Sequence, residues 1–393
     1  MKSVLDNLQA CTGCHACFSA CPVNAIEMIQ DNMGFAAPTI KQDKCLDCKK
    51  CQSICPVMNS KKNIEEDEAF ACHSKSFERR LKSASGGFFT ELAEHIIQNG
   101  GIVYGVAYDE NWQPRHIRVD RADKLPLLKG SKYAQSVVGD CFCEIKAYLK
   151  AKKTVLFSGT PCQVAGLKTY LGGDYCNLIC VDNICHGVAS PKTWKLYLQE
   201  ISNGHSVVEY LNRNKEKGIY RSYVRVRMEN GKVISRRLDD DSFQRLYQSD
   251  AILRDSCYQC MFKGDNHVSD ITIGDFWGIE NYHRELSDIY GSSCVIVHSE
   301  KGRQYWKKVK TRLNWIDSKL SYVTASNPSY FQTTVEPSFR NELIETINQF
   351  GVKTAIRVWN PRTIGFYKRR IITDINDIKG DMALFVKKII KRS

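Results

Sequence analysis

Eight of the 18 cysteines lie within the first 55 residues and form two runs with the same spacing. Each run reads Cys-x2-Cys-x2-Cys-x3-Cys-Pro, and the second begins 34 residues after the first. The first run comprises Cys11, Cys14, Cys17 and Cys21, and the second comprises Cys45, Cys48, Cys51 and Cys55. Thiolates at this spacing bind [4Fe-4S] clusters, and the fourth cysteine of each run binds the cluster of the other run.

The spacing therefore predicts a crossed pair of clusters. The expected ligand sets are Cys11, Cys14, Cys17 and Cys55 for one cluster, and Cys45, Cys48, Cys51 and Cys21 for the other. A pair of zinc sites is the alternative, but four zinc ligands per site give no reason for the repeated Cys-Pro displacement. We expect residues 1–60 to form a bacterial-type 2[4Fe-4S] ferredoxin domain.

Length and composition limit what the rest of the chain can be. The chain has 393 residues, of which 43% are hydrophobic and 25% charged, and its formal net charge is +13. This length predicts two or three domains, and the composition excludes disorder for most of the chain. The first residues lack the apolar stretch of a signal peptide, and no apolar run reaches the roughly 18 residues of a membrane span. We therefore expect a cytoplasmic protein whose clustered cysteines bind metal.

Beyond residue 69 the sequence alternates between helix and strand patterns. Helices are predicted over 88–98, 139–150 and 161–171, with another beginning at Ser190-Pro191, and strands over 102–108, 154–157 and 177–184. Asn230-Gly231 predicts a hairpin between strands 223–228 and 232–237. The alternation favours an α/β domain with a mixed, mostly parallel sheet.

Three further groups of residues in this region could do chemistry. Glycine-rich turns precede two predicted helices, at Ser85-Gly86-Gly87 and Gly159-Thr160-Pro161, and free amides at a helix N-terminus bind phosphate. The basic loop Lys129-Gly130-Ser131-Lys132-Tyr133 could hold phosphates and a ring. On the residues alone, ordinary turns and a solvated basic loop are the simpler interpretations. The third group consists of four scattered cysteines: Cys162, Cys185, Cys257 and Cys260.

Together these motifs resemble the beta subunit of coenzyme F-420 hydrogenase and its dehydrogenase relatives. The resemblance covers roughly residues 70–300, behind the ferredoxin module that many members carry. In order, the motifs are Ser85-Gly86-Gly87, Gly130-Ser131-Lys132-Tyr133, Gly159-Thr160-Pro161-Cys162-Gln163, Cys185-His186-Gly187, Cys257-x2-Cys260 and Gly274-Asp275-Phe276-Trp277-Gly278. In the last motif we expect Phe276 and Trp277 to be exposed.

The resemblance implies an iron–sulfur flavoprotein that binds FAD and a third [4Fe-4S] cluster. Carried over by position, the third cluster would be bound by Cys162, Cys185, Cys257 and Cys260. The FAD would be lined by Ser85, Gly86, Gly87, Ser131, Lys132, Tyr133, Gly159 and Thr160. His186 could donate a proton beside either group or be a structural histidine, and the sequence identifies no catalytic residue.

The expected fold has three parts. They are an α+β ferredoxin-like N-terminal module (1–60), an α/β flavin-binding core with a mixed sheet (70–324) and a helical, basic C-terminus (325–393), with a linker over 61–69. The six remaining cysteines are expected to be core residues: Cys72, Cys141, Cys143, Cys176, Cys180 and Cys294.

The expected function is electron transfer between a ferredoxin-type carrier, the clusters, FAD and a two-electron acceptor or donor. That small molecule could be a deazaflavin or another unsaturated compound, and the sequence does not choose. The alternative is an electron-relay subunit of a larger hydrogenase or dehydrogenase complex, with no substrate of its own. A redox sensor is disfavoured because sensing does not need three clusters and a flavin. The chain could also form a homo-oligomer.

Helices are also predicted over 336–350 and 374–392. From Lys353 onward, eleven Lys or Arg stand against three Asp, which accounts for most of the positive charge. Such an end could lie on the inner face of a membrane, dock an acidic partner or simply pack as a solvated helix. Nucleic acid is not expected as a partner, because no reading motif accompanies the charge.

Overall fold

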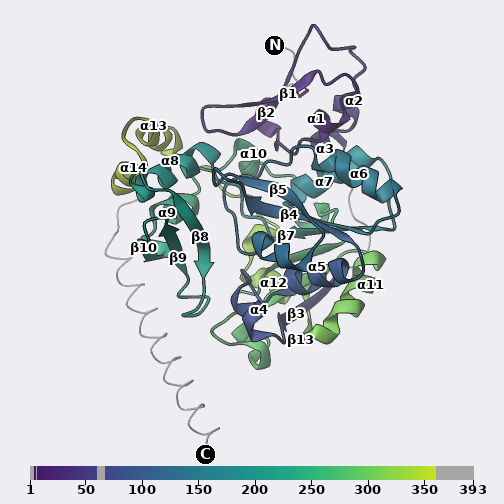
Figure 1. The fold of residues 1–393 in the computed structure, drawn as a ribbon, viewed down its shortest axis with the longest axis vertical. Helices are drawn as coiled ribbons and strands as arrows, with labels where there is room; N and C mark the ends of the chain where they lie inside the picture. The colour runs from purple at the N-terminus through teal and green to yellow at the C-terminus, as the bar shows by residue number, and fades with distance from the viewer. Residues whose placement is uncertain (1–3, 6, 60–66, 360–393) are drawn as a thin grey trace, which may run out of the picture.

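The structure, a computed structural model, describes residues 4–5, 7–59 and 67–359 (Figure 1). The helix predicted over 374–392, and the basic segment beyond residue 359, lie outside the described residues. Within the part that is described, no helix combines the length and the apolar character needed to span a bilayer.

The N-terminal module pairs two short strands with short helices that begin within or beside the cysteine runs. Strands β1 (Ile26–Gln30) and β2 (Ala36–Ile40) are antiparallel. The helical elements are η1 (Leu8–Ala10), α1 (Ala16–Ala20), α2 (Lys50–Ser53) and α3 (Pro56–Asn59). This α+β module caps one end of the molecule, at the top of Figure 1.

An eight-stranded mixed sheet forms the centre of the main domain. Its order is β13-β3-β12-β11-β7-β6-β4-β5, in which β4, β6, β7 and β11 are parallel and the other pairs antiparallel. The strands are β3 (Glu68–Ser74), β4 (Ile102–Tyr108), β5 (Pro114–Val119), β6 (Val155–Ser158), β7 (Leu178–Asn183), β11 (Ile271–Asp275), β12 (Ser293–Val297) and β13 (Leu313–Ser318). The predicted mixed α/β architecture is confirmed.

The α-helices of the main domain lie between these strands or after them in the chain. They are α4 (Phe77–Leu81), α5 (Phe88–Gln98), α6 (Cys141–Lys150), α7 (Pro161–Leu171), α8 (Pro191–Ser202), α9 (Ser242–Gln248), α10 (Asp255–Tyr258), α11 (Glu300–Val309), α12 (Leu320–Ala325), α13 (Arg340–Phe350) and α14 (Val352–Trp359).

Helices cover both faces of the sheet because successive residues of its central strands point into different cores. Leu156 and Ile179 pack on one face with residues of α5 and α11. Their neighbours Val155, Phe157 and Leu178 pack on the other face with residues of α6 and α7. The sheet is therefore the middle layer of three.

A second, three-stranded antiparallel sheet of order β10-β9-β8 lies beside the main sheet, at the left of Figure 1. Its strands are β8 (Val207–Asn214), β9 (Tyr223–Met228) and β10 (Val233–Arg237). The hairpin predicted at Asn230-Gly231 is confirmed. This sheet shares a core with α8, α9, α13 and α14, in which Trp194, Phe243 and Ile356 are buried.

Some local predictions were wrong. Phe276 is only 3% exposed, because it packs with the buried side chains of Ile279 and Tyr330. Cys143 and Cys176 are exposed rather than core residues, whereas Cys72, Cys141, Cys180 and Cys294 are buried. The helix predicted from residue 336 begins at Arg340, after Pro337, and Gly351 separates it from α14.

Candidate functional site

The two cysteine runs fold into the same turn. Gly13 and Asp47 precede the second cysteine of their runs and have φ of 63° and 51°. His15 and Lys49 follow that cysteine and have φ of 67° and 57°. Residues other than glycine rarely adopt this left-handed conformation. Its recurrence shows that the same cysteine spacing produces the same backbone twice.

Backbone amides in both runs point at cysteine sulfurs. The amide of Gly13 donates to Cys11 Sγ at 3.5 Å, and the amide of Asp47 donates to Cys45 Sγ at 3.4 Å. Such donors stabilise the thiolate form that binds iron, and they tune the reduction potential of a cluster.

Folding gathers these eight cysteines into two groups of four, each of which takes its fourth member from the other run. One small cavity is lined by Cys11, Cys14, Cys17 and Cys55, and a second by Cys21, Cys45, Cys48 and Cys51. We call them the first and second cysteine groups. Burial, and then the thiols of Cys11 and Cys55, raise the pKa of Cys14 to about 12. A bound metal cation removes the cost of ionising a buried thiol, because it attracts the thiolate. Each group of four cysteines is therefore a donor set that fits one of the crossed clusters.

The remaining predicted cluster ligands begin with Cys162, in the first turn of α7. Pro161 occupies the first helical position, and Thr160 and Gln163 form a reciprocal capping box. Together they fix where the helix starts. Cys162 is thereby held at the end of β6, with its sulfur 3.1 Å from Thr160 Oγ1.

The other three predicted ligands lie around Cys162. Cys185 follows β7, Cys257 lies in α10, and Cys260 follows that helix. Burial, and then the neighbouring thiols of Cys260, Cys185 and Cys257, raise the pKa of Cys162 well above its ordinary value. The structure therefore brings these four thiols together, and we call them the third cysteine group. In the described residues, no three His, Cys, Asp or Glu side chains are placed to hold a single metal ion.

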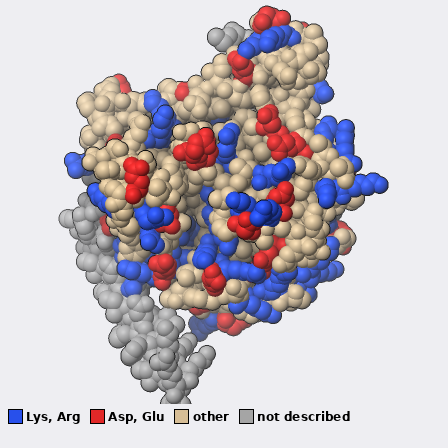
Figure 2. Space-filling view, in the orientation of Figure 1, with Lys and Arg blue, Asp and Glu red and all other residues tan. Residues whose placement is uncertain are grey.

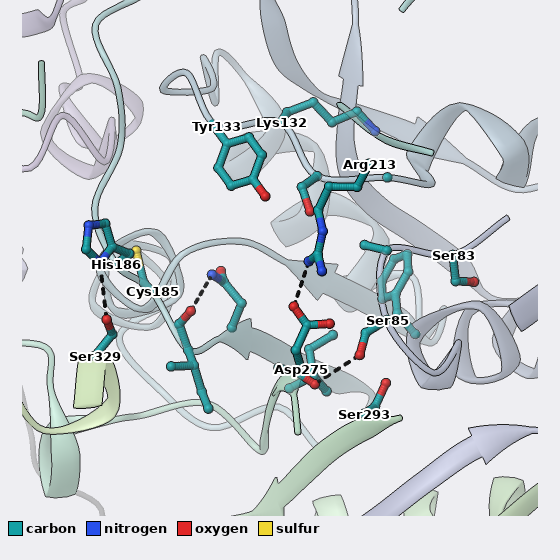
Figure 3. Close-up of a pocket in the computed structure, with 18 of the residues that line it drawn as sticks. Ser83, Ser85, Lys132, Tyr133, Cys185, His186, Arg213, Asp275, Ser293 and Ser329 are labelled. Carbon is teal, nitrogen blue, oxygen red and sulfur yellow. Dashed lines mark hydrogen bonds and ion pairs between the residues drawn. The ribbon is translucent and has the colours of Figure 1, made fainter. Parts of the chain in front are cut away.

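A cavity of about 850 Å³ lies next to the third cysteine group (Figure 3). The residues that end the parallel strands β6, β7 and β11 line it, together with the turn before α5. This is the usual place for a ligand in an open α/β sheet, beyond the carboxyl ends of the parallel strands. Cys185 and His186 lie at one end of the cavity and Ser85 at the other.

Seven of the eight residues predicted to line FAD do line this cavity: Ser85, Gly87, Ser131, Lys132, Tyr133, Gly159 and Thr160. Gly86 instead packs against two strands, where a Cβ atom would lie 2.5 Å from the backbone nitrogen of Ser293. The Lys132 ammonium group donates to the carbonyls of Leu127 and Lys129. Through these two hydrogen bonds the lysine braces its own loop, and burial lowers its pKa to about 7.

A largely buried ion pair in the cavity was not predicted from the sequence. Arg213 Nη1 on β8 lies 2.6 Å from Asp275 Oδ2 at the end of β11. The Asp275 carboxylate holds the pKa of Arg213 above its ordinary value, although burial opposes it. The other oxygen, Asp275 Oδ1, is buried with no hydrogen-bond partner among the described residues. Asp275 lies in one of the six motifs, but no sequence pattern pointed to Arg213.

Lys215 was not predicted either. It is only 1% exposed, and its ammonium group donates to the carbonyls of Ser85 and Tyr290. It thereby fixes the turn before α5. Burial, and then the nearby positive charge of Arg80, lower the pKa of Lys215 to about 7.

His186 is held from both sides at the cavity wall. Its Nε2 lies 2.5 Å from Asp250 Oδ1, and its Nδ1 lies 3.2 Å from Ser329 Oγ. Both ring nitrogens are therefore engaged, and the ring is fixed next to Cys185 (Figure 3).

The charges in the cavity are largely paired. Arg213 pairs with Asp275, and Arg237 pairs with Asp239 at 3.2 Å. Basic and acidic side chains are also interspersed over the face drawn in Figure 2, with Lys and Arg densest along its lower edge.

The parallel strands of the α/β domain end at a cavity beside four cysteine thiols, and the N-terminal module holds two more groups of four. This is the architecture of an iron–sulfur redox protein. Residues 152–317 match the family described as the C terminus of the coenzyme F420 hydrogenase/dehydrogenase beta subunit, and residues 10–59 match the 4Fe-4S dicluster domain. Residues 152–317 therefore carry the C-terminal domain of that family, and residues 10–59 carry a 4Fe-4S dicluster domain.

Similar curated proteins are redox enzymes or their subunits. The chain is 23% identical over 165 residues to the F subunit of the F(420)H(2) dehydrogenase from Methanosarcina mazei, covering 39% of this chain and 46% of that protein. It is 26% identical over 170 residues to coenzyme F420-dependent sulfite reductase of Methanocaldococcus jannaschii, covering 43% and 26%. The chain thus spans less than half the length of either relative.

Two other likenesses cover different parts of the chain. A polyferredoxin-like protein of Methanocaldococcus jannaschii is 38% identical over 66 residues, covering 15% of this chain and 38% of that protein. Among solved structures, a chain of the F420-reducing [NiFe] hydrogenase complex from Methanosarcina barkeri has a TM-score of 0.43 at 16% identity, covering 77% of this chain and 92% of that one.

Proposed function

We propose that this protein is an iron–sulfur flavoprotein oxidoreductase. It passes electrons between a ferredoxin-type carrier, three [4Fe-4S] clusters, FAD and a two-electron acceptor or donor such as a deazaflavin or another unsaturated small molecule. The observation that carries the proposal is the position of Cys185. This residue belongs to the third cysteine group and also lines the large cavity. A cluster held there would adjoin whatever the cavity binds.

The cavity offers polar groups that FAD would use. The turn before α5 has no side-chain cap, so its amides are available to a pyrophosphate. The unpartnered Asp275 Oδ1 offers an acceptor for a ring N–H or a ribose hydroxyl, while Arg213 holds its carboxylate in place. FAD, when bound, exchanges electrons singly with clusters and in pairs with a substrate.

The chain's own residues order this site. Lys215 ties the Ser85 turn to the loop that carries Tyr290, and Lys132 closes its loop onto the carbonyls of Leu127 and Lys129. Both lysines donate their hydrogen bonds to backbone carbonyls, so the loops around the cavity are ordered before a ligand binds.

An electron-relay subunit of a larger complex is the second candidate. The name of the Methanosarcina mazei relative, which is one subunit of a dehydrogenase, favours it. In that case the partner would be another subunit of a dehydrogenase, and the cavity would bind FAD but no substrate. Turnover of a small molecule by the purified protein with ferredoxin as the only other protein would exclude the relay interpretation.

The proposal is tested by anaerobic purification followed by iron, acid-labile sulfide and flavin analysis. Three four-iron clusters predict about twelve irons per chain, together with one FAD. About eight irons without flavin would contradict the core-site proposal.

Replacing one ligand of the third group separates the two cofactors. The Cys257→Ser variant should keep its FAD but lose about four irons and the ability to have its flavin reduced by ferredoxin. Cys176→Ser is the control, because Cys176 is exposed and lies in none of the three groups. Unchanged flavin reduction in Cys257→Ser would refute the role of the third group.

A further inference from the structure

The N-terminal module meets the main domain at the first cysteine group, and α7 forms one side of the contact. Gly166, one turn along α7 from Cys162, packs directly on Cys14. A Cβ atom added at Gly166 would lie 2.9 Å from both Cβ and Sγ of Cys14. Packed atoms do not approach that closely without displacement. The glycine therefore lets a member of the first group contact the helix that carries a member of the third.

Arg254 makes a second connection between the same two groups. Its Nε donates to the carbonyl of Cys11 at 2.6 Å, and its terminal nitrogens donate to Gln135 Oε1 at 2.8 Å and to Ala36 O at 3.0 Å. Its own carbonyl accepts from the amide of Cys257 at 2.8 Å. A single buried residue thus bonds the first group through its side chain and the third through its main chain.

Gln135 completes the contact. Its Oε1 accepts from Arg254, and its Nε2 donates to the carbonyl of Thr12 at 2.8 Å. A Cβ atom at Gly13 would lie 2.8 Å from Arg254 Nη1 and 3.0 Å from Gln135 Nε2, so the loop sits directly on both side chains. At the position in the other run that matches Thr12, Leu46 is 66% exposed.

We propose that Arg254, Gln135 and Gly166 are positioning residues that hold the first cysteine group at a fixed place beside the third. The proposal rests on the proposed function, because it takes both groups to hold clusters. A bound cluster supplies one-electron transfer, which needs close and constant spacing. These three residues provide that spacing in the protein, and they leave the second group on the side that a redox partner can reach.

Electron paramagnetic resonance of the dithionite-reduced protein gives a readout that a purely structural role would not move. Reduced clusters that lie close together broaden each other's signals. The part of this broadening that is lost when Cys257→Ser removes the third cluster measures the interaction of the third cluster with its neighbours. Arg254→Gln and Gly166→Ala should retain parental iron and FAD content but lose most of this component. Reduction of the flavin by ferredoxin should slow as well, because the first and third clusters would no longer be held at a constant spacing.

Each variant has a matched control. Arg340→Gln removes an arginine that bonds the same loop through Leu253 O and Asp255 Oδ1. Gly173→Ala adds a methyl group just beyond α7, where a Cβ atom meets nothing within 4 Å. Both controls should keep the parental spectrum and rate.

A gentler variant guards against misfolding. Gln135→Glu keeps an oxygen for Arg254 but loses the donor to Thr12 O, and it should give an intermediate loss of the broadening. Parental spectra and rates in Gly166→Ala and Gln135→Glu would overturn the proposal, whatever Arg254→Gln does. A parent protein with about eight irons and no FAD would instead refute the proposed function itself.

Discussion

The two cysteine loops of the N-terminal module have the same spacing and the same left-handed turns, yet their surroundings differ. In the first loop, Cys14 is 8% exposed and packs on α7, and Arg254 bonds the backbone. In the second loop, Cys48 and Leu46 are exposed. The comparison teaches that cysteine spacing determines how a loop presents its sulfurs, whereas the residues packed around it determine which part of the protein it serves.

The largest expected contrast comes from removing one ligand in each loop. Cys14→Ala and Cys48→Ala should each lose about four irons. Cys14→Ala should also reduce the free energy of unfolding by about 2–4 kcal/mol more than Cys48→Ala, because it opens a gap at the contact with α7. Anaerobic urea titrations with iron analysis would measure both effects. Equal destabilisation would show that the first loop is not built into the main domain.

An intermediate effect is expected where the module inserts into the main domain. Gly34 has φ of 80°, and a Cβ atom there would lie 2.8 Å from the backbone nitrogen of Lys192. Gly34→Ala should therefore reduce the free energy of unfolding by about 2–3 kcal/mol.

Gly231 offers the matched control for that variant. It has φ of 81° in the hairpin between β9 and β10, with nothing within 4 Å of an added Cβ atom. Gly231→Ala should cost only about 1 kcal/mol from backbone strain. Urea titrations followed by intrinsic tryptophan fluorescence measure the free energy of unfolding of both variants, and equal losses would argue against a tight contact at Gly34.

The smallest contrast concerns the left-handed residues of the two loops. Lys49 is exposed, so Lys49→Gly should raise the free energy of unfolding by up to about 1 kcal/mol by relieving its backbone. His15 is 6% exposed, so His15→Gly should lower it by about 1–2 kcal/mol through lost burial. The same urea titrations measure both changes in the free energy of unfolding. Changes of the same sign in the two variants would contradict the difference between the loops.

The sequence predicted what depends on local pattern. The spacing of the two runs predicted two crossed sets of cysteines, and the members of each set line one cavity. Gly100-Gly101 marked the end of α5 and the start of β4. Asn230-Gly231 likewise located the β9–β10 hairpin, because these residues favour a tight turn.

Contacts between distant residues could not be predicted in the same way. Arg213 and Asp275 are 62 residues apart, and Arg254 and Gln135 are 119 apart. The sequence around a single arginine or glutamine does not indicate which distant residue it will contact. Phe276 was misjudged for the same reason, since its burial depends on Tyr330, which arrives much later in the chain.

The turn between β1 and β2 has a consequence for how the protein is made. Met33 and Phe35 lie in one hydrophobic core with Trp194 of α8 and Ile356 of α14. The first forty residues therefore cannot bury this turn on the ribosome until at least α8, whose Ser190 and Lys192 bond to the carbonyl of Met33, has been synthesised. Burial of this turn of the N-terminal module therefore depends on residues more than 150 positions later in the chain, and until they are made Met33 and Phe35 stay exposed to chaperones or to aggregation.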